Sequence, residues 1–394
     1  MVYHNCKFFS DLPQNWNIIS RRNSLIMSFA KLVIQANIMQ VTKIPKQIEI
    51  VNDYASLILA LKKTVKNNSL TCVLICSGKY SSDALANKVS EDLSDCVNVE
   101  NKIVYESDIA EILQLDKIKS FSELYEILER SGINTKLVAK TSTAIIAIGG
   151  GKLLDYCKYL AYKSQTQLIS VPSLVSNNGI CSSLAVLHTN NYQAQMPIAL
   201  LVPLYIIQDT PLEHLQAAIG DLIGKLALPA KQEFMDDFAA ILSNRSSLGV
   251  IQLLQNYVLT SKSIEPELIL RDKDFLRALI ENLGLSGIAM SYSANLESHF
   301  GFEYLISLAI DELFGSKTLH GIQVLIASLY LEKLNGVDLL TGAALDYEHS
   351  SLKTLLLSLA FPCEFEDIDL SKSDIEQVLK LATSKVDARC LLTP

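Results

Sequence analysis

The first half of the chain alternates short apolar runs with stretches in which apolar residues recur at helical spacing. Short runs without charges are typical of strands that are buried on both faces of a parallel sheet. Their alternation with helices predicts βαβ units. The predicted strands are 48–51, Leu70–Cys76, 101–106, Ala144–Ile148 and 167–171, and the predicted helices are Tyr54–Val65, Ser82–Leu93, Phe121–Gly132 and 152–163.

The pattern changes after about residue 208, where helical spacing dominates. We therefore predict an α/β fold in which a Rossmann-like parallel sheet domain is followed by an all-helical domain. The expected parts are a peripheral N-terminal segment at 1–45, the α/β domain at 46–208 and the helical domain at 209–394. The predicted helical segments are Leu212–Leu228, Ala239–Leu242, Val250–Thr260, Asp274–Ile288, Gly301–Phe314, Gly321–Leu334 and one or two short helices from about Ser371.

Composition and charge narrow the class of protein. The 394 residues are 49% hydrophobic and carry a formal net charge of −8. An acidic chain without basic clusters is not a general nucleic-acid binder. No apolar run is long enough to span a bilayer, and the first residues lack the pattern of a secretory signal. The eight cysteines are scattered without a CxxC motif, which favours reduced thiols in a cytoplasmic protein.

Three adjacent glycines follow the predicted strand Ala144–Ile148 and open the next helix. Gly149, Gly150 and Gly151 let a backbone approach a pyrophosphate, and a helix N-terminus attracts the same anion. Lys152 adds a positive charge, and Asp155 lies one turn into the helix. A turn that needs glycine only for steric reasons is the alternative. The strand, the lysine and the helix favour a nucleotide site.

The type of nicotinamide nucleotide stays open. A dinucleotide fold usually places an acid after a strand to hold the ribose hydroxyls. After Leu70–Cys76 the chain instead has Ser77, Gly78 and Lys79. Lys79 is either a partner for a 2′-phosphate or a solvated loop lysine. The expected cofactor is therefore NAD or NADP.

Six motifs together resemble the iron-containing alcohol dehydrogenase and dehydroquinate synthase-like superfamily. Their order is most similar to that of its glycerol-1-phosphate dehydrogenase branch. The resemblance implies an active site in a cleft between the two domains, a divalent metal (Zn²⁺, Ni²⁺ or Fe²⁺), a small-molecule substrate, and a homodimer or larger homo-oligomer. The motifs are GGGKLLDYCKYLA, ISVPSLVSNNGICSSLAVL, IGDLIGK, SGIAMSYS, GFEYLISLAI and TLHGIQV.

The metal site that the resemblance implies is incomplete. Asp221 matches the family's acidic ligand and was expected at the start of a helix, and His320 matches its last histidine ligand. The middle histidine falls on Tyr304. A neutral phenol is a poor metal ligand because its pKa lies near 10. Tyr304 is therefore a candidate hydrogen-bond donor to a substrate carbonyl. His299 is a weaker candidate for a substitute ligand.

The resemblance also implies roles around the substrate and the nicotinamide. Asn178 stands where the family has an Asp that touches substrate hydroxyls, and Glu297 replaces an arginine expected to bind phosphate. The second change argues against glycerol-1-phosphate as the substrate. Lys225, one turn after Asp221, either binds an anionic substrate group or pairs with Asp221. Candidate contacts to the cofactor are Ser173, Ser176 and Ser182.

Three functions are compatible with these residues. The first is an NAD(P)-dependent oxidoreductase that acts on a small polyol, a polyol phosphate or a ketone. The second is an NAD(P)-binding pseudoenzyme or partner subunit, since the glycine turn is intact while the metal ligands are not. The third is a cyclase of the dehydroquinate synthase kind.

Overall fold

A computed structural model gives the fold. The residues that it describes are 44–78, 82–99, 104–105, 142–187, 190–226, 238–260, 265–292, 301–315, 318–340, 342, 344–345 and 350–390. The predicted segment 1–45, apart from its last two residues, and the predicted helix Phe121–Gly132 lie outside them. The boundaries between the three expected parts stay a prediction.

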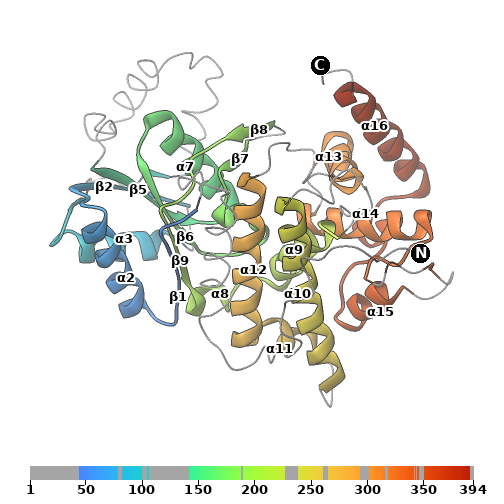
Figure 1. Ribbon diagram of the computed structural model, residues 1–394, viewed down its shortest axis with the longest axis horizontal. Coiled ribbons are helices and arrows are strands. Elements are labelled where there is room, and N and C mark those ends of the chain that lie inside the picture. Colours follow the sequence, from blue (N-terminus) through green and yellow to red (C-terminus); the bar gives the residue numbers. More distant parts are fainter. Residues whose placement is uncertain are drawn as a thin grey trace, which may run out of the picture. The chain divides into compact units, whose positions relative to one another are not determined.

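The centre of the fold is a seven-stranded parallel sheet with the order β1-β9-β6-β5-β2-β3, with β4 paired to the end of β2 (Figure 1). Four of its strands, β1, β2, β5 and β6, lie at strands that the sequence predicted, and β4 lies within the predicted strand 101–106. Every residue of β2 and β5 is buried, as expected for strands with helices on both faces. The strands are β1 Gln47–Val51, β2 Cys72–Ser77, β3 Asn98–Val99, β4 Val104–Tyr105, β5 Thr143–Gly149, β6 Gln167–Pro172 and β9 Ala199–Pro203.

Alternate residues of each strand enter two different hydrophobic cores. Val73 and Ile75 of β2 face the core that contains α2 (Tyr54–Asn67) and α3 (Asp83–Leu93). Leu74 and Cys76 face the core that contains α7 (Gly151–Ser164) and the helices that follow the sheet. This period of two is the geometry of a strand, so the sheet separates the molecule into layers. Helix α7 also packs against a two-stranded hairpin of β7 (Leu184–Leu187) and β8 (Asn190–Gln193).

The second half of the described chain is helical, as the spacing predicted. The predicted segments Ala239–Leu242 and Val250–Thr260 form one continuous helix, α10, because Ser243–Gly249 continues it without a proline. The final predicted short helices are a single helix, α16. The helices are α8 Leu204–Ile207, α9 Leu212–Gly224, α10 Phe238–Thr260, α11 Pro266–Leu270, α12 Lys273–Tyr292, α13 Phe302–Phe314, α14 His320–Asn335, α15 Ser351–Ser358 and α16 Lys372–Cys390.

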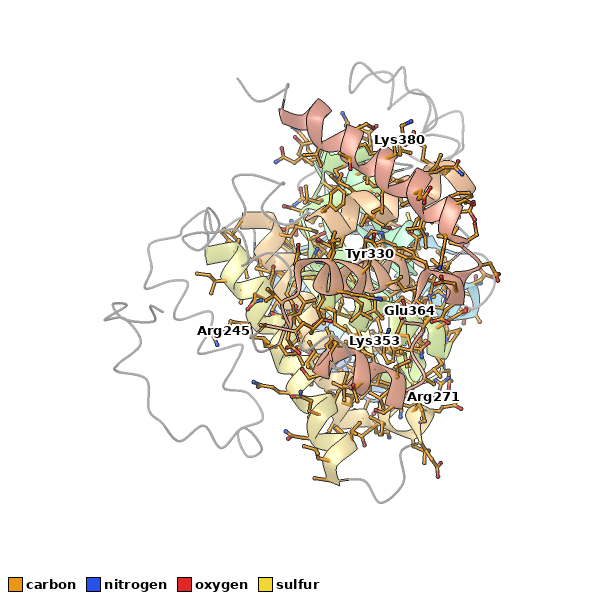
Figure 2. All side chains as sticks on the ribbon, turned by 90° about the vertical axis from the view of Figure 1, so that its right-hand side faces the viewer. Arg245, Arg271, Tyr330, Lys353, Glu364 and Lys380 are labelled. Atoms are coloured by element: carbon orange, nitrogen blue, oxygen red, sulfur yellow. The ribbon has the colours of Figure 1, made fainter. Side chains whose placement is uncertain are left out.

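Polar and aromatic contacts join the helical elements at their surface. Figure 2 shows Lys353 of α15 beside Glu364, with which it forms an ion pair. The ring of Tyr330 lies edge-on to Phe365, with 5.5 Å between the ring centroids. Arg271 donates to the carbonyls of Gln208 and Thr210 and so ties α11 to the turn after α8. None of the helices in the described ranges combines the length and the apolar character that a membrane crossing requires.

Candidate active site

The glycine turn joins the carboxyl end of β5 to the N-terminus of α7. A Cβ on Gly149 would come within 2.4 Å of Leu153 Cδ2, so packing alone explains this glycine. A Cβ on Gly151 would meet nothing closer than Asn177 at 3.6 Å, and one on Gly150 would only touch Leu174 at 3.4 Å. Packing therefore leaves these two glycines unexplained. The steric interpretation explains Gly149, and the nucleotide role of Gly150 and Gly151 stays a prediction.

The first turn of α7 has the features of an anion site. Its N-cap, Gly150, provides no side-chain acceptor for the amide groups that follow. Such amide groups and the helix dipole favour a phosphate at this end. Lys152 is exposed there, with its ammonium 5.9 Å from the Tyr156 ring centroid. The residues that would hold a dinucleotide pyrophosphate are therefore Gly150, Gly151 and Lys152.

The loop after β6 lies beside this turn. Ser173 N–H donates to the Gly149 carbonyl at 2.9 Å, which brings the ends of β5 and β6 together. Ser173 and Ser176 are partly exposed in this loop, as a cofactor contact requires. The loop then forms a short 3₁₀ turn at Asn178–Cys181, capped by the Asn177 side chain, which accepts from Gly179 N–H. The contacts of Ser173 and Ser176 to a cofactor stay a prediction.

A buried lysine that the sequence analysis did not single out organises this loop. Lys158 of α7 is 1% exposed, and its Nζ lies 2.8 Å from the Gly179 carbonyl and 3.0 Å from Ser182 Oγ. It also bonds to the Leu184 carbonyl and pairs with Asp155 at 2.6 Å. A buried ammonium needs such partners to offset its desolvation. Lys158 thus fixes the backbone of residues 179–184 to α7.

Asp155 and Ser182, both predicted cofactor contacts, take part in the same cluster. Asp155 accepts from Lys158 Nζ and from Val186 N–H, and burial raises the pKa of its carboxyl group while Lys158 lowers it. Ser182 Oγ accepts from Lys158 and donates to the Leu184 carbonyl. Their described contacts hold the loop, and a contact to the cofactor stays a prediction.

Helix α12 closes on the loop from the other side. A Cβ on Gly287 would come within 2.4 Å of the Asn178 carbonyl and 2.5 Å of the Cys181 carbonyl. On the same helix, Ser286 Oγ accepts from Asn178 Nδ2 at 3.1 Å, and Ser291 Oγ accepts from Ser183 N–H at 2.7 Å. The loop is therefore held between α7 and α12, and Asn178 is 6% exposed.

Asp221 lies in the last turn of α9, so the expectation that it would start a helix is wrong. Sequence spacing alone predicted a helix that continued to residue 228, and α9 ends at Gly224. The helix dipole disfavours an acid at this end. Asp221 is 4% exposed, and its Oδ2 accepts from Asn178 N–H at 3.0 Å. Its position is therefore not explained by helix stability.

Two glycines bring Asp221 and His320 close to the same point. A Cβ on Gly220 would lie 2.2 Å from the Gly321 carbonyl, and one on Gly321 would lie 1.9 Å from the Ala217 carbonyl. The backbones of α9 and α14 therefore touch where these helices cross. Asp221 follows one glycine and His320 precedes the other, so this crossing sets their separation.

His320 is the first residue of α14 and packs against Tyr304 of α13. Their rings form an edge-to-face pair with centroids 5.2 Å apart. His320 Nδ1 lies 2.8 Å from Ser307 Oγ. Burial lowers the pKa of His320; Lys225 lowers it too, while Asp221 and Asp311 raise it. The net lowering leaves the imidazole neutral at neutral pH.

Lys225 and Glu303 add buried charges to this cluster. Lys225 follows the last residue of α9 and is 5% exposed. Glu303, in the first turn of α13, is 2% exposed and accepts from Gly301 N–H at 3.0 Å. The chain thus brings Asp221, Lys225, Tyr304 and His320 into one buried polar cluster, next to the loop at Asn178.

This cluster does not fit the divalent metal that the family resemblance implied. Within the described residues, no group of three His, Cys, Asp or Glu side chains is placed to hold a metal ion. The third position is a phenol, and the ammonium of Lys225 lies close enough to act on His320. Two protein ligands beside a cation are a poor site for Zn²⁺, which takes three or four.

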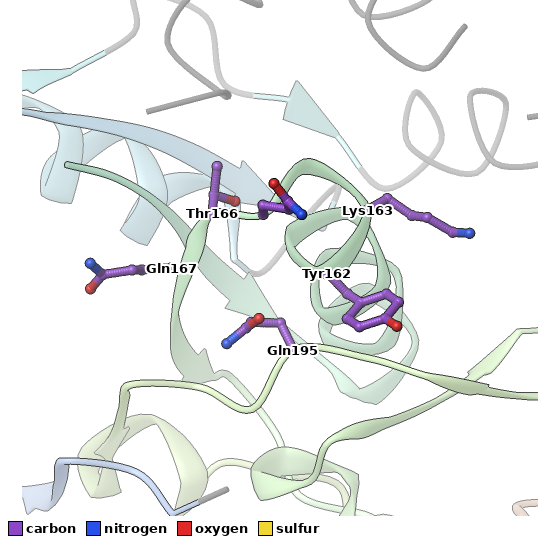
Figure 3. A pocket seen from close by; sticks show the side chains of 6 residues that line it. Tyr162, Lys163, Thr166, Gln167 and Gln195 are labelled. Atoms are coloured by element: carbon purple, nitrogen blue, oxygen red, sulfur yellow. The ribbon is translucent and has the colours of Figure 1, made fainter. Parts of the chain in front are cut away.

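A cavity of about 580 Å³ lies elsewhere, between the carboxyl end of α7 and the amino end of β6 (Figure 3). Its polar walls include Tyr162, Lys163 and Gln195. The 14 residues of α7 separate this cavity from the glycine turn by about 20 Å. It is not part of the candidate site. Lys79, Glu297 and His299 lie outside the described residues, so their predicted roles stay predictions.

Comparison with known proteins finds similarity to one family of enzymes. The family model for iron-containing alcohol dehydrogenases matches residues 55–211, which include the glycine turn and the loop. Over this range the chain is similar to iron-containing alcohol dehydrogenases. It is 28% identical over 283 residues to glycerol-1-phosphate dehydrogenase [NAD(P)+] of Sulfurisphaera tokodaii, covering 67% of this chain and 71% of the relative. It is 32% identical over 206 residues to the enzyme of that name from Pyrococcus abyssi, covering 49% and 56%.

Solved structures support the same fold. The glycerol dehydrogenase of Schizosaccharomyces pombe superposes with a TM-score of 0.64 at 16% identity, covering 86% of this chain and 82% of that chain. The NADH-dependent butanol dehydrogenase A of Thermotoga maritima superposes with a TM-score of 0.59 at 13% identity, covering 87% and 89%. The predicted parallel sheet with a helical second half is therefore confirmed.

Proposed function

We propose that this protein is an NAD(P)-dependent oxidoreductase that transfers a hydride between the nicotinamide and a small polyol, a polyol phosphate or the corresponding ketone. The observation that carries the proposal is the pair Gly150 and Gly151. A Cβ would fit at either position, so packing within the protein does not require glycine there. The printed names of the relatives agree with a dehydrogenase that uses NAD(P).

The residues around the glycine turn support the cofactor. When bound, the nicotinamide supplies or accepts the hydride. The amide groups of the first turn of α7 and the Lys152 ammonium hold the negative pyrophosphate. Lys158 and α12 hold the loop from Asn178 to Leu184, so its backbone is ordered before a ligand arrives. An ordered loop costs less entropy on binding.

The cluster around Tyr304 has the groups needed to stabilise negative charge on a substrate carbonyl oxygen. During reduction, negative charge develops on that oxygen, and a positioned donor stabilises it. The Tyr304 phenol, 6% exposed and packed on His320, is our candidate donor. Lys225 contributes a positive charge to the same region. No step is assigned to a metal, since the donors among the described residues do not form a metal site.

A glycine variant tests the cofactor half of this proposal. Gly151→Ala adds one carbon atom that the protein has space for, since a Cβ there meets only Asn177 at 3.6 Å. We expect unfolding temperature to change little and the Kd for NAD(P) to rise at least about tenfold, or about 1.4 kcal/mol. Binding is measured by nucleotide fluorescence titration. Unchanged binding would leave the turn with only its steric role.

Turnover over a panel of small polyols and ketones tests the reaction. Nicotinamide absorbance is followed with NAD(H) and NADP(H), with and without phosphate on the substrate. Oxidation or reduction of any member supports the proposal. Nucleotide binding without turnover favours the second function, a cofactor-binding pseudoenzyme, which the absence of three metal-binding side chains in the described residues also motivates. Turnover without net absorbance change would indicate the cyclase.

A further inference from the structure

A chain of buried polar side chains leads away from His320 into the helical core. His320 Nδ1 lies 2.8 Å from Ser307 Oγ, and Ser307 Oγ lies 2.5 Å from Gln323 Oε1. Gln323 Nε2 lies 2.9 Å from Asp311 Oδ1 and 3.4 Å from the Thr318 carbonyl. Ser307 and Gln323 are both 0% exposed. Ser307 lies in the motif GFEYLISLAI and Gln323 in the motif TLHGIQV, but the sequence assigned no role to either residue.

The acceptors at the far end fix the direction of every hydrogen bond in this chain. Asp311 Oδ1 and the Thr318 carbonyl only accept, so the Gln323 amide nitrogen must face them. The opposite orientation would set two pairs of acceptors against each other. The Gln323 carbonyl oxygen therefore faces Ser307, and the Ser307 hydroxyl must donate to it.

This direction determines which nitrogen of His320 carries the proton. Because the Ser307 proton points to Gln323, Ser307 Oγ meets His320 Nδ1 with a lone pair. Nδ1 must then donate. In a neutral imidazole only one nitrogen is protonated, so Nε2 keeps its lone pair. Nε2 is the nitrogen on the far side of the ring from Ser307.

We propose that Gln323, acting through Ser307, is a positioning residue that holds His320 as its Nδ1–H tautomer. His320 then presents an Nε2 acceptor to the cluster of Asp221, Lys225 and Tyr304. An alcohol substrate binds there with its reacting hydroxyl donating to Nε2. This last step rests on the proposed function, whereas the tautomer is a property of the protein alone.

The tautomer is measured on the full-length protein without cofactor or substrate. Two-bond ¹H–¹⁵N spectra of histidine-labelled protein at about pH 8, where an ordinary histidine is neutral, distinguish the two nitrogens. The chain has six histidines, and the signal missing from His320→Asn identifies His320. We expect a protonated Nδ1 and an unprotonated Nε2. A protonated Nε2 in the wild type would overturn the proposal.

Three glutamine variants separate positioning from packing. Gln323→Met keeps the length of the side chain but removes the acceptor, which frees the Ser307 proton, so we expect the proton of His320 to move to Nε2. Gln323→Glu keeps an oxygen opposite Ser307. Its second oxygen faces Asp311 and carries the proton that two such close carboxyl groups share, so it still donates there, and the variant should restore the Nδ1–H tautomer. Gln216→Met is the matched control, since it removes another buried glutamine, whose Nε2 donates to the Ala360 carbonyl at 2.9 Å. An unchanged tautomer in Gln323→Met, or the same shift in Gln216→Met, would contradict the role of Gln323.

Kinetics show separately whether the tautomer serves the reaction. We expect Gln323→Met to lower kcat by at least tenfold with a smaller change in KM, and Gln323→Glu to recover part of kcat. A tautomer that moves while kcat stays unchanged would overturn the catalytic part. If no substrate is turned over by the wild type, the proposed function fails, and the spectra still decide the tautomer.

Discussion

At the scale of single residues, Tyr304 carries the largest departure from the family pattern. We expect Tyr304→Phe to reduce kcat by about 10²–10⁴-fold, because one positioned proton donor contributes this much. The ring stays in place, since its edge-to-face contact with His320 does not use the hydroxyl. NAD(P) affinity should therefore remain close to wild type. A variant with full turnover would remove Tyr304 from the mechanism.

The ion pair between Lys158 and Asp155 leads to a second prediction at the scale of single residues. Lys158→Met leaves the carboxylate of Asp155, whose side chain is only 15% exposed, without its cation, and we expect the free energy of unfolding to fall by about 3 kcal/mol. Chemical denaturation measures the loss. The double variant Lys158→Met with Asp155→Asn removes the unpaired charge, and it should be more stable than Lys158→Met alone. If the stability loss of the double variant equals the sum of the losses of Lys158→Met and Asp155→Asn measured alone, the ion pair does not hold the loop.

At the scale of elements, α12 offers two glycines one turn apart with opposite environments. A Cβ on Gly287 would collide with two carbonyls of the loop at 2.4 and 2.5 Å, whereas one on Gly284 meets only Leu200 at 3.9 Å. We expect Gly287→Ala to push the loop from α12, to destabilise the protein by about 1–3 kcal/mol and to weaken NAD(P) binding.

Gly284→Ala is the matched control for this comparison. An alanine at an unstrained helical position is stabilising by about 0.5–1 kcal/mol relative to glycine. Thermal unfolding and nucleotide titration of both variants therefore separate the effect of the contact from the effect of helix propensity. Equal stability for the two variants would mean that α12 does not position the loop.

The sequence predicted those elements well that local spacing and composition define. The strands Cys72–Ser77 and Thr143–Gly149 and the helices of the second half lie near the predicted positions. The strand Ala199–Pro203 and the hairpin after β6 were not predicted. The strand Ala199–Pro203 pairs with β1, from the start of the described chain, and local spacing carries no information about such a distant partner.

The same contrast between local and distant information applies to the residues of the site. Glycines at a strand–helix junction were visible in the sequence because three of them are adjacent. Lys158, Ser307 and Gln323 were not visible, since each is an ordinary helical residue until other elements bring acceptors to it. Asp221 was placed at the wrong end of its helix because an acid usually marks a helix start.

At the scale of the whole molecule, ligands should stabilise the fold according to what the site can hold. A ligand that binds only the folded state stabilises it by about 2.7 kcal/mol at a hundred times its Kd. We expect NAD or NADP to raise the unfolding temperature by several degrees at such a concentration, since the turn and the loop that would bind it join β5, α7 and α12.

Metal ions should behave differently from the nucleotides. Only Asp221 and His320 match the ligands of the family that the chain resembles, and Lys225 acts on the same histidine. We therefore expect Zn²⁺, Ni²⁺ and Fe²⁺ to cause no specific stabilisation. EDTA should likewise leave both the unfolding temperature and turnover unchanged. Thermal scans of the protein with each ion, with EDTA and with Asp221→Asn test this. A metal-dependent rise that Asp221→Asn abolishes would show that the site recruits a metal, with ligands from the chain outside the described residues completing it.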